Sequence, residues 1–128
     1  MPFHVLHVDD DRVNTLLFEQ VCLQIDGLTV ASAETGAEAE ALAAEFPPHL
    51  LVIDLHLPDT DGYALLSRLR AAAGSNVTAV LCTAENRADV ADAAASAGYQ
   101  MIWPKPVVLA DVRSALQQLS ANGPADTP

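Results

Sequence analysis

Positive charge is the scarcest property of this 128-residue chain. Lysine and arginine together number six, aspartate and glutamate number 17, and the formal net charge at pH 7 is −11. DNA and anionic membranes repel a domain with this charge. We therefore expect neither nucleic acid nor a membrane among its partners.

Cysteine is nearly absent as well. Cys22 falls in a helical pattern and Cys82 in a strand pattern, without a CxxC pair or a spacing typical of metal ligands. We expect both to be buried free thiols. The four histidines are dispersed along the chain, which argues against a histidine-based zinc site.

Long apolar runs are also missing, and none of those present is long enough to span a membrane. The first expected strand begins at residue 3, which leaves no room for a signal peptide. These absences favour the cytoplasm as the location.

A short apolar run followed by a helical pattern does occur, and it occurs five times. The strands are expected at residues 3–8, 28–31, 50–53, 77–82 and 101–104, and the helices at residues 12–25, 36–46, 63–73, 87–97 and 109–119. Apolar runs without alternation are typical of parallel strands that are buried on both faces. The pattern predicts one domain over residues 1–120 and a flexible tail over residues 121–128.

Helical spacing predicts which side chains of the first two helices point inward. Val13, Leu17 and Val21 recur at every fourth residue and make one apolar face. In the second helix we expect Ala39, Leu42 and Phe46 to pack inward.

Polar residues directly follow four of the five expected strands. They are Asp9 and Asp10, Asp54, Thr83, and Lys105, which is the only lysine. The carboxyl ends of parallel strands meet at one edge of a sheet, where ligands of such folds bind. We therefore expect these side chains to form one site.

Phosphoryl transfer is the chemistry that suits this set. A carboxylate such as Asp54 can attack phosphorus and form an acyl phosphate. The phosphoryl oxygens repel an anionic nucleophile, so Mg²⁺ is needed between them, and Asp9 and Asp10 supply carboxylate ligands for it. Lys105 can neutralise the phosphoryl oxygens, and the Thr83 hydroxyl can hydrogen-bond one of them.

This ordered set, each member at a strand end, resembles the receiver domain of two-component response regulators. The matching motifs are Asp9-Asp10, Asp54, Thr83-Ala84 and Lys105-Pro106, and the resemblance covers residues 5 to about 119. It implies an α/β fold of the CheY-like, flavodoxin-like type. That fold is a doubly wound five-stranded parallel sheet of order 2-1-3-4-5 with five helices.

The resemblance also implies a role for each residue of the site. Asp54 would be the phosphoacceptor, and the protein would catalyse only its own phosphorylation and dephosphorylation. Asp10, Asp54 and the backbone carbonyl of His56 would bind Mg²⁺ directly, with Asp9 acting mainly through water. Lys105 would pair with the phosphate and form a cis peptide bond with the following proline, while Thr83 would turn toward the phosphate.

Two kinds of partner follow from the same resemblance. A sensor histidine kinase or a histidine phosphotransfer protein would donate the phosphoryl group. A downstream protein would bind the face formed by the fourth helix, the fifth strand and the fifth helix. His56 and Glu85 occupy positions from which receivers can tune the lifetime of the phosphoryl group.

The chain departs from the receiver pattern near the lysine. Receivers usually carry Tyr or Phe three residues before it, where this chain has Ile102, with Trp103 next and Tyr99 three residues earlier. The aromatic residue that takes part in the receiver switch is therefore missing from its usual position. Pro104 lacks an N–H group, which suits an edge strand.

Two other functions remain as alternatives to a phosphorylation switch. One is a protein-binding module that keeps the fold but does not respond to phosphate, and Ile102 gives it some support. The other is a phosphatase of the haloacid-dehalogenase type. That class needs Asp-x-Asp at the nucleophile, whereas this chain has Asp54-Leu55-His56 and no insertion to hold a substrate.

Three further aspartates have simpler interpretations. Asp11 is expected at a helix N-terminus, where the helix dipole favours an acid. Asp59 and Asp61 are expected in a solvated loop.

Overall fold

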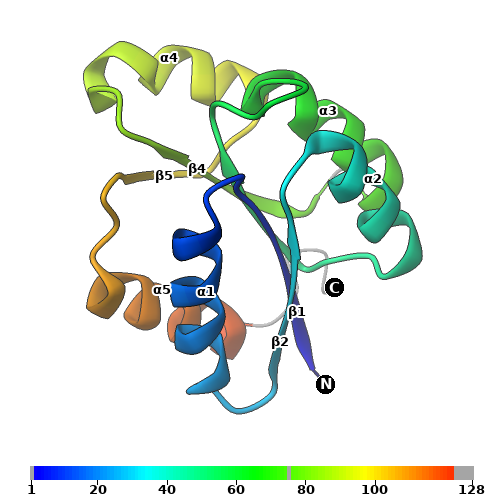
Figure 1. The fold of residues 1–128 in the computed structure, drawn as a ribbon, viewed down its shortest axis with the longest axis vertical. Helices are drawn as coiled ribbons and strands as arrows, with labels where there is room; N and C mark the ends of the chain where they lie inside the picture. Colours follow the sequence, from blue (N-terminus) through cyan, green and yellow to red (C-terminus); the bar gives the residue numbers. More distant parts are fainter. Residues whose placement is uncertain (1, 75, 123–128) are drawn as a thin grey trace.

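The computed structural model describes residues 2–74 and 76–122, and ten elements alternate along them (Figure 1). The strands are β1 (Phe3–Val8), β2 (Leu28–Ala33), β3 (Leu50–Asp54), β4 (Thr78–Thr83) and β5 (Met101–Pro104). The helices are α1 (Arg12–Leu23), α2 (Gly36–Glu45), α3 (Gly62–Ala73), α4 (Arg87–Ala97) and α5 (Leu109–Asn122). The predicted alternation of strand and helix is confirmed.

The five strands form one parallel sheet in the order β2-β1-β3-β4-β5. This is the predicted order. Every residue of the central strand β3 is buried, in agreement with its unbroken apolar sequence. β5 lies at an edge, where the missing N–H of Pro104 leaves no inner strand unpaired.

Helices cover both faces of the sheet (Figure 1). α1 and α5 lie on one face, over a core cluster that includes Phe18, Val52 and Val112. α2, α3 and α4 lie on the other face, over a cluster that includes Leu51 and Leu66. Because all strands run in the same direction, their carboxyl ends come together at one edge between these two layers.

The predicted inward face of α1 is wrong at two of its three positions. Val13 is 64% exposed and Leu17 is 42% exposed, whereas Phe18, Val21 and Cys22 are buried. The helix carries more apolar residues than one face can hold. Helical spacing is therefore compatible with two neighbouring buried stripes, one with Val13 and Leu17 and one with Phe18 and Cys22. The stripe with the aromatic ring packs against the sheet, because it fills the space there best.

The predicted inward position of Phe46 is also wrong, because this residue is 61% exposed. It caps α2 with extended backbone instead of continuing the helix, so helical spacing no longer applies to its side chain. The ring lies edge-on to His4, with 6.4 Å between the ring centroids. The buried face of α2 consists of small residues, among them Ala39 and Ala43.

Several element ends differ from the prediction. α1 ends at Leu23, two residues early, and β2 extends to Ala33 because it pairs with β1 along its whole length. α5 extends to Asn122, so Ala121 and Asn122, which were assigned to the flexible tail, are helical. The rest of the predicted tail, residues 123–128, lies outside the described residues.

Two expectations from composition can be compared with the structure. Both cysteines are free and buried, as predicted, and burial raises the pKa of each thiol to about 12, so that both are protonated at neutral pH. Among the described residues, no helix combines the length and the apolar character that a membrane crossing requires.

Candidate functional site at the carboxyl ends of the strands

Buried polar groups gather at one edge of the sheet. Within residues 2–74 and 76–122, the polar or charged side chains that are buried are those of His7, Asp9, Asp54 and Thr83. They lie at or near the carboxyl ends of β1, β3 and β4. Burying such groups costs free energy unless they are paired, so their concentration here indicates a functional site.

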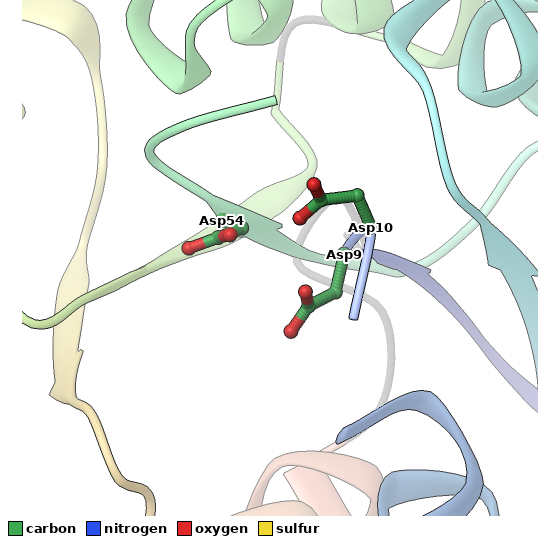
Figure 2. Close-up of side chains that lie close together, drawn as sticks. All are labelled: Asp9, Asp10 and Asp54. Atoms are coloured by element: carbon green, nitrogen blue, oxygen red, sulfur yellow. The ribbon is translucent and has the colours of Figure 1, made fainter. Parts of the chain in front are cut away.

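Three carboxylates converge at this edge, as the sequence predicted. Asp9 and Asp10 follow β1 and Asp54 ends β3, and Figure 2 shows their side chains close together. One carboxylate oxygen from each lies within 4.8 Å of the others. An all-oxygen donor set of this charge suits a hard divalent cation such as Mg²⁺.

The single lysine follows the edge strand β5 and contacts two of these three carboxylates. The Lys105 Nζ lies 3.1 Å from Asp54 Oδ1 and 3.2 Å from Asp9 Oδ2. The Lys105 backbone N–H donates to the Thr83 carbonyl oxygen at 2.8 Å, which continues the pairing of β5 with β4. The Lys105–Pro106 peptide bond is cis, as the resemblance implied.

Burial and an excess of negative charge both shift the pKa values of this group. Burial raises the pKa of Asp54; the hydrogen bond and charge of Lys105 oppose this, while Asp9 and Asp10 add to it. Burial alone would lower the pKa of Lys105, but its contacts with Asp54 and Asp9 outweigh burial and raise it. The two upward shifts are consistent, because one ammonium group cannot compensate three carboxylates. A bound cation would restore the balance.

Thr83 lies at the site, and its hydroxyl oxygen already accepts one hydrogen bond. It follows Cys82, which is the β4 partner of Asp54 in the sheet register. Its Oγ1 accepts a hydrogen bond from the Glu85 backbone N–H at 3.0 Å. An accepting hydroxyl keeps its own proton for a further acceptor, which is what binding a phosphoryl oxygen requires.

His56 and Glu85, which lie in the loops after β3 and β4, contact each other. The His56 Nε2 lies 2.6 Å from Glu85 Oε2, and both side chains are largely exposed. The imidazole therefore points toward Glu85. The sequence named both residues without predicting their contact, because they are 29 positions apart.

The loop after β3 is more ordered than a solvated loop. The Asp59 carboxylate accepts hydrogen bonds from the backbone N–H groups of Gly36 and Ala37 at 2.8 and 3.0 Å, and these bonds lower its pKa. Asp61 is the N-cap of α3 and accepts from Ala64 N–H at 2.9 Å. Both side chains are exposed as predicted, but each also fixes a helix start.

Asp11 has the predicted place at a helix N-terminus. It is the N-cap of α1, and its Oδ1 accepts from the N–H groups of Val13 and Asn14 at 2.9 and 3.2 Å. The Asp11 N–H in turn donates to Asp9 Oδ1 at 2.9 Å. These bonds hold the turn that carries the first two carboxylates of the site.

His7 is a residue of this region that sequence reasoning missed. Its side chain is 5% exposed and stacks on the Phe18 ring, with 4.1 Å between the centroids. Burial lowers the pKa of His7 to about 4, with Asp9 raising and Lys105 lowering it by smaller amounts, so the ring is neutral at pH 7. Its position inside an apolar run was a signal for burial.

The aromatic residues near Lys105 are committed elsewhere. The Tyr99 ring is buried and its hydroxyl donates to the Gly62 carbonyl oxygen at 2.6 Å. Ile102 packs on the face of the sheet that α4 covers, whereas Trp103 packs on the opposite face. Tyr99 and Trp103 therefore do not replace the aromatic side chain that receivers usually carry at the position of Ile102.

Comparison with known proteins decides the family. A family model described as the response regulator receiver domain matches residues 5–117. The chain belongs to this family. This receiver domain therefore has a place in two-component signalling, and its CheY-like fold is the one that its sheet order shows.

Curated relatives of this receiver domain are longer proteins. It is 34% identical over 113 residues to a protein-glutamate methylesterase/protein-glutamine glutaminase of Myxococcus xanthus, with 88% of this chain and 32% of the relative covered. It is 31% identical over 132 residues to the response regulator MprA of a Mycobacterium species (strain KMS), with 100% and 56% covered. The chain thus spans about a third to just over half of these proteins.

Solved structures agree with the fold. A putative response regulator from Chloroflexus aurantiacus is 28% identical, covers 94% of this chain and 99% of its own, and superposes with a TM-score of 0.82. The chemotaxis response regulator CheY4 of Vibrio cholerae is 22% identical over 93% of this chain and 99% of its own, with a TM-score of 0.83. The second likeness is one of fold.

Proposed function

We propose that this receiver domain accepts a phosphoryl group on Asp54 in a Mg²⁺-dependent reaction and then changes its contacts with another protein. The donor would be the phosphohistidine of a sensor histidine kinase or of a histidine phosphotransfer protein. The observation that carries the proposal is the position of Asp54, between two further carboxylates within 4.8 Å and an ammonium group at 3.1 Å. That arrangement suits an acyl phosphate.

In the reaction, an oxygen of the Asp54 carboxylate forms a bond to phosphorus while the bond between phosphorus and the donor nitrogen breaks. Lys105 already holds Asp54 Oδ1 and can pair with the phosphoryl oxygens as they arrive. Asp10, Asp54 and the His56 carbonyl would hold Mg²⁺, with Asp9 acting through water. When bound, the ion supplies positive charge between the nucleophile and the phosphoryl oxygens.

Output would pass through the face made by α4, β5 and α5. Thr83, whose hydroxyl proton is free to donate, would bind a phosphoryl oxygen and move the chain that leads into α4. A hollow of about 470 Å³ lies between α4 and β5, so side chains there have room to rearrange. The net charge of −11 supports a protein partner for this domain rather than nucleic acid.

Mass spectrometry of the intact protein with Mg²⁺ and acetyl phosphate tests the acceptor. We expect the mass of one phosphoryl group to be added to the wild type and to Asp59→Asn, which removes an exposed carboxylate nearby. Asp54→Asn should gain nothing. Labelling of Asp54→Asn, or no labelling of the wild type with Mg²⁺ present, would contradict the proposal.

A phosphate-independent binding module is the second candidate, and Ile102 in place of the usual aromatic residue is the observation that favours it. Beryllofluoride with Mg²⁺ separates the two, because it mimics the phosphoryl group at the acceptor. A switch predicts amide chemical-shift changes in α4 and β5, whereas the module predicts changes confined to the site. The phosphatase alternative has no observation in its favour.

A further inference from the structure

Arg87 is the first residue of α4, and its side chain connects this helix to the edge strand β5. The Arg87 Nη2 donates a hydrogen bond to the backbone carbonyl oxygen of Ile102 at 2.7 Å. Among the described residues, no other side chain of α4 donates to or accepts from β5. A charged donor makes a stronger hydrogen bond than a neutral one. This single bond therefore holds the start of α4 on β5.

The C-terminal end of α4 is fixed more firmly than its start. Gly98 caps the helix in the left-handed conformation, with φ 107°, and its N–H donates to the Ala94 carbonyl oxygen at 3.1 Å. The Tyr99 N–H donates to the same oxygen at 3.0 Å, and the Tyr99 hydroxyl donates to the Gly62 carbonyl oxygen. Because Tyr99 is buried, its hydrogen bonds lie in a place of low dielectric constant and are strengthened.

Packing adds little at the start of α4. The buried residues of the helix are Val90 and Ala94, neither of which lies in its first turn. Arg87 and Ile102 both line the hollow of about 470 Å³ between α4 and β5. Small side chains bury little apolar surface, so they contribute little to holding the helix in place. The start of α4 therefore has room to move while its C-terminal end stays fixed.

The chain between the acidic site and Arg87 is short. Thr83 ends β4, its Oγ1 accepts a hydrogen bond from the Glu85 N–H, and Asn86 is the N-cap of α4. β5 is paired with β4 along its whole length, up to Pro104 opposite Thr83. A displacement of the chain after Thr83 would therefore move the start of α4 relative to β5. The hydrogen bond of Arg87 joins these two parts.

We propose that the hydrogen bond from Arg87 to Ile102 is a latch, which holds the start of α4 on β5 in the unphosphorylated domain and breaks when Thr83 binds a phosphoryl oxygen. This inference rests on the proposed function, because it requires that phosphorylation of Asp54 displaces the chain after Thr83. Arg87 then couples α4 to β5 in a receiver that lacks the usual aromatic residue. A contact made only in the unphosphorylated state opposes phosphorylation, so removing it favours the phosphorylated state.

Titration with beryllofluoride in the presence of Mg²⁺ tests the latch in the full chain. Arg87→Met removes the donor and keeps an unbranched side chain. We expect this variant to bind beryllofluoride about two- to fivefold more tightly than the wild type, since an exposed hydrogen bond no longer has to be broken. Loss of a positive charge alone would weaken the binding of an anion, so charge cannot explain tighter binding.

Arg113→Met is the matched control. It makes the same change on α5 at an exposed position outside the hollow, and it should not bind beryllofluoride more tightly than the wild type. Amide chemical shifts give a second measure. In Arg87→Met without beryllofluoride, the signals of Ala95 and Trp103 should move part of the way toward their positions in the beryllofluoride-bound wild type.

The outcomes separate the latch from the proposed function. If the wild type does not bind beryllofluoride, both are wrong. If the wild type binds it, and Arg87→Met binds it equally or more weakly, the latch is overturned and the proposed function stands. Equal tightening in Arg87→Met and Arg113→Met would also overturn the latch, because only Arg87 contacts Ile102.

Discussion

At the carboxyl ends of β1 and β3 the protein buries charged and polar side chains, whereas between α4 and β5 it leaves a hollow. The first region holds Asp9, Asp54 and His7 at a cost in free energy, which contacts with Lys105 partly offset. The second is lined by Arg87 and three alanines of α4 and by the five residues from Tyr99 to Trp103. The first region therefore concentrates buried charge, while the second has unfilled space at its surface.

The difference fits the division of work that we propose for this receiver domain. Chemistry at a carboxylate needs fixed charges in a partly buried place, so the acidic site is held by specific contacts. A surface that changes partners needs alternatives of similar free energy, which a loosely packed region provides. Four predictions separate these two descriptions, beginning with the largest effect.

His7→Phe should change the acid stability of the protein more than any other substitution named below. The His7 pKa falls from 6.5 to about 4 on folding, so the unfolded chain binds the proton first as the pH is lowered. The free energy of unfolding should then drop by about 3 kcal/mol between pH 7 and pH 4 because of this ring. Urea unfolding at several pH values measures it.

In His7→Phe that part of the pH dependence should vanish. A smaller loss below pH 6.5 should remain in both proteins, since burial also lowers the pKa of His4. Equal acid losses in the variant and the wild type would show that His7 is not held neutral by burial.

Lys105→Met tests the balance of charge at the acidic site. Removing the ammonium group leaves Asp9 and Asp54 without their partner, which should lower the free energy of unfolding by about 2 kcal/mol, less than for a fully buried pair because Lys105 is partly exposed. Mg²⁺ should stabilise the variant more than the wild type. Thermal unfolding with and without Mg²⁺ measures both effects.

The control for this substitution is Arg12→Met. Arg12 pairs with Glu34 at 3.8 Å on the surface, and its loss should cost less than 1 kcal/mol, with no dependence on Mg²⁺ beyond that of the wild type. Equal losses in the two variants would mean that the lysine is an ordinary surface charge.

Tyr99→Phe tests a buried hydrogen bond beside the hollow between α4 and β5. The change removes a buried hydrogen bond of 2.6 Å and leaves the Gly62 carbonyl oxygen without that donor, which should cost about 1.5 kcal/mol. Phosphorylation by acetyl phosphate should be unaffected. A fall in the labelling rate without a fall in stability would place Tyr99 in the signalling path rather than in the core.

Ile102→Tyr is expected to have the smallest effect. The hollow between α4 and β5 has room for the larger side chain, so the free energy of unfolding should change by only about 0.5 kcal/mol. Val80→Phe, a comparable enlargement in the packed centre of β4, should cost about 1 to 3 kcal/mol. Chemical denaturation compares the two, and a large loss for Ile102→Tyr would show that this region is as tightly packed as the core.

Much of the fold could be predicted because strand patterns are local. The unbroken apolar run before Asp54 placed a buried central strand, and the structure has it there. Which side of a helix is buried was harder to predict. Val13 and Leu17 fit the helical period as well as Phe18 and Cys22 do, and only the shape of the sheet surface beneath them decides between the two stripes.

The candidate site shows the same division. Asp9, Asp10, Asp54 and Lys105 were predicted to meet because each follows a strand, and strand ends in a parallel sheet share an edge. The bonds from Asp59 to the start of α2, by contrast, join residues 22 and 23 positions apart through two loops. Loop paths depend on what they pack against, so local sequence does not fix them.

By itself, then, the sequence determined the order of strands and helices and the set of residues at the strand ends, because backbone preferences and apolar periodicity act over a few residues. The tertiary structure decided the depth to which His7 is buried, the contact of His56 with Glu85, and the hydrogen bond from Arg87 to Ile102. Those features depend on how whole elements pack together. Packing is a property of surfaces distant in sequence, and no local pattern records it.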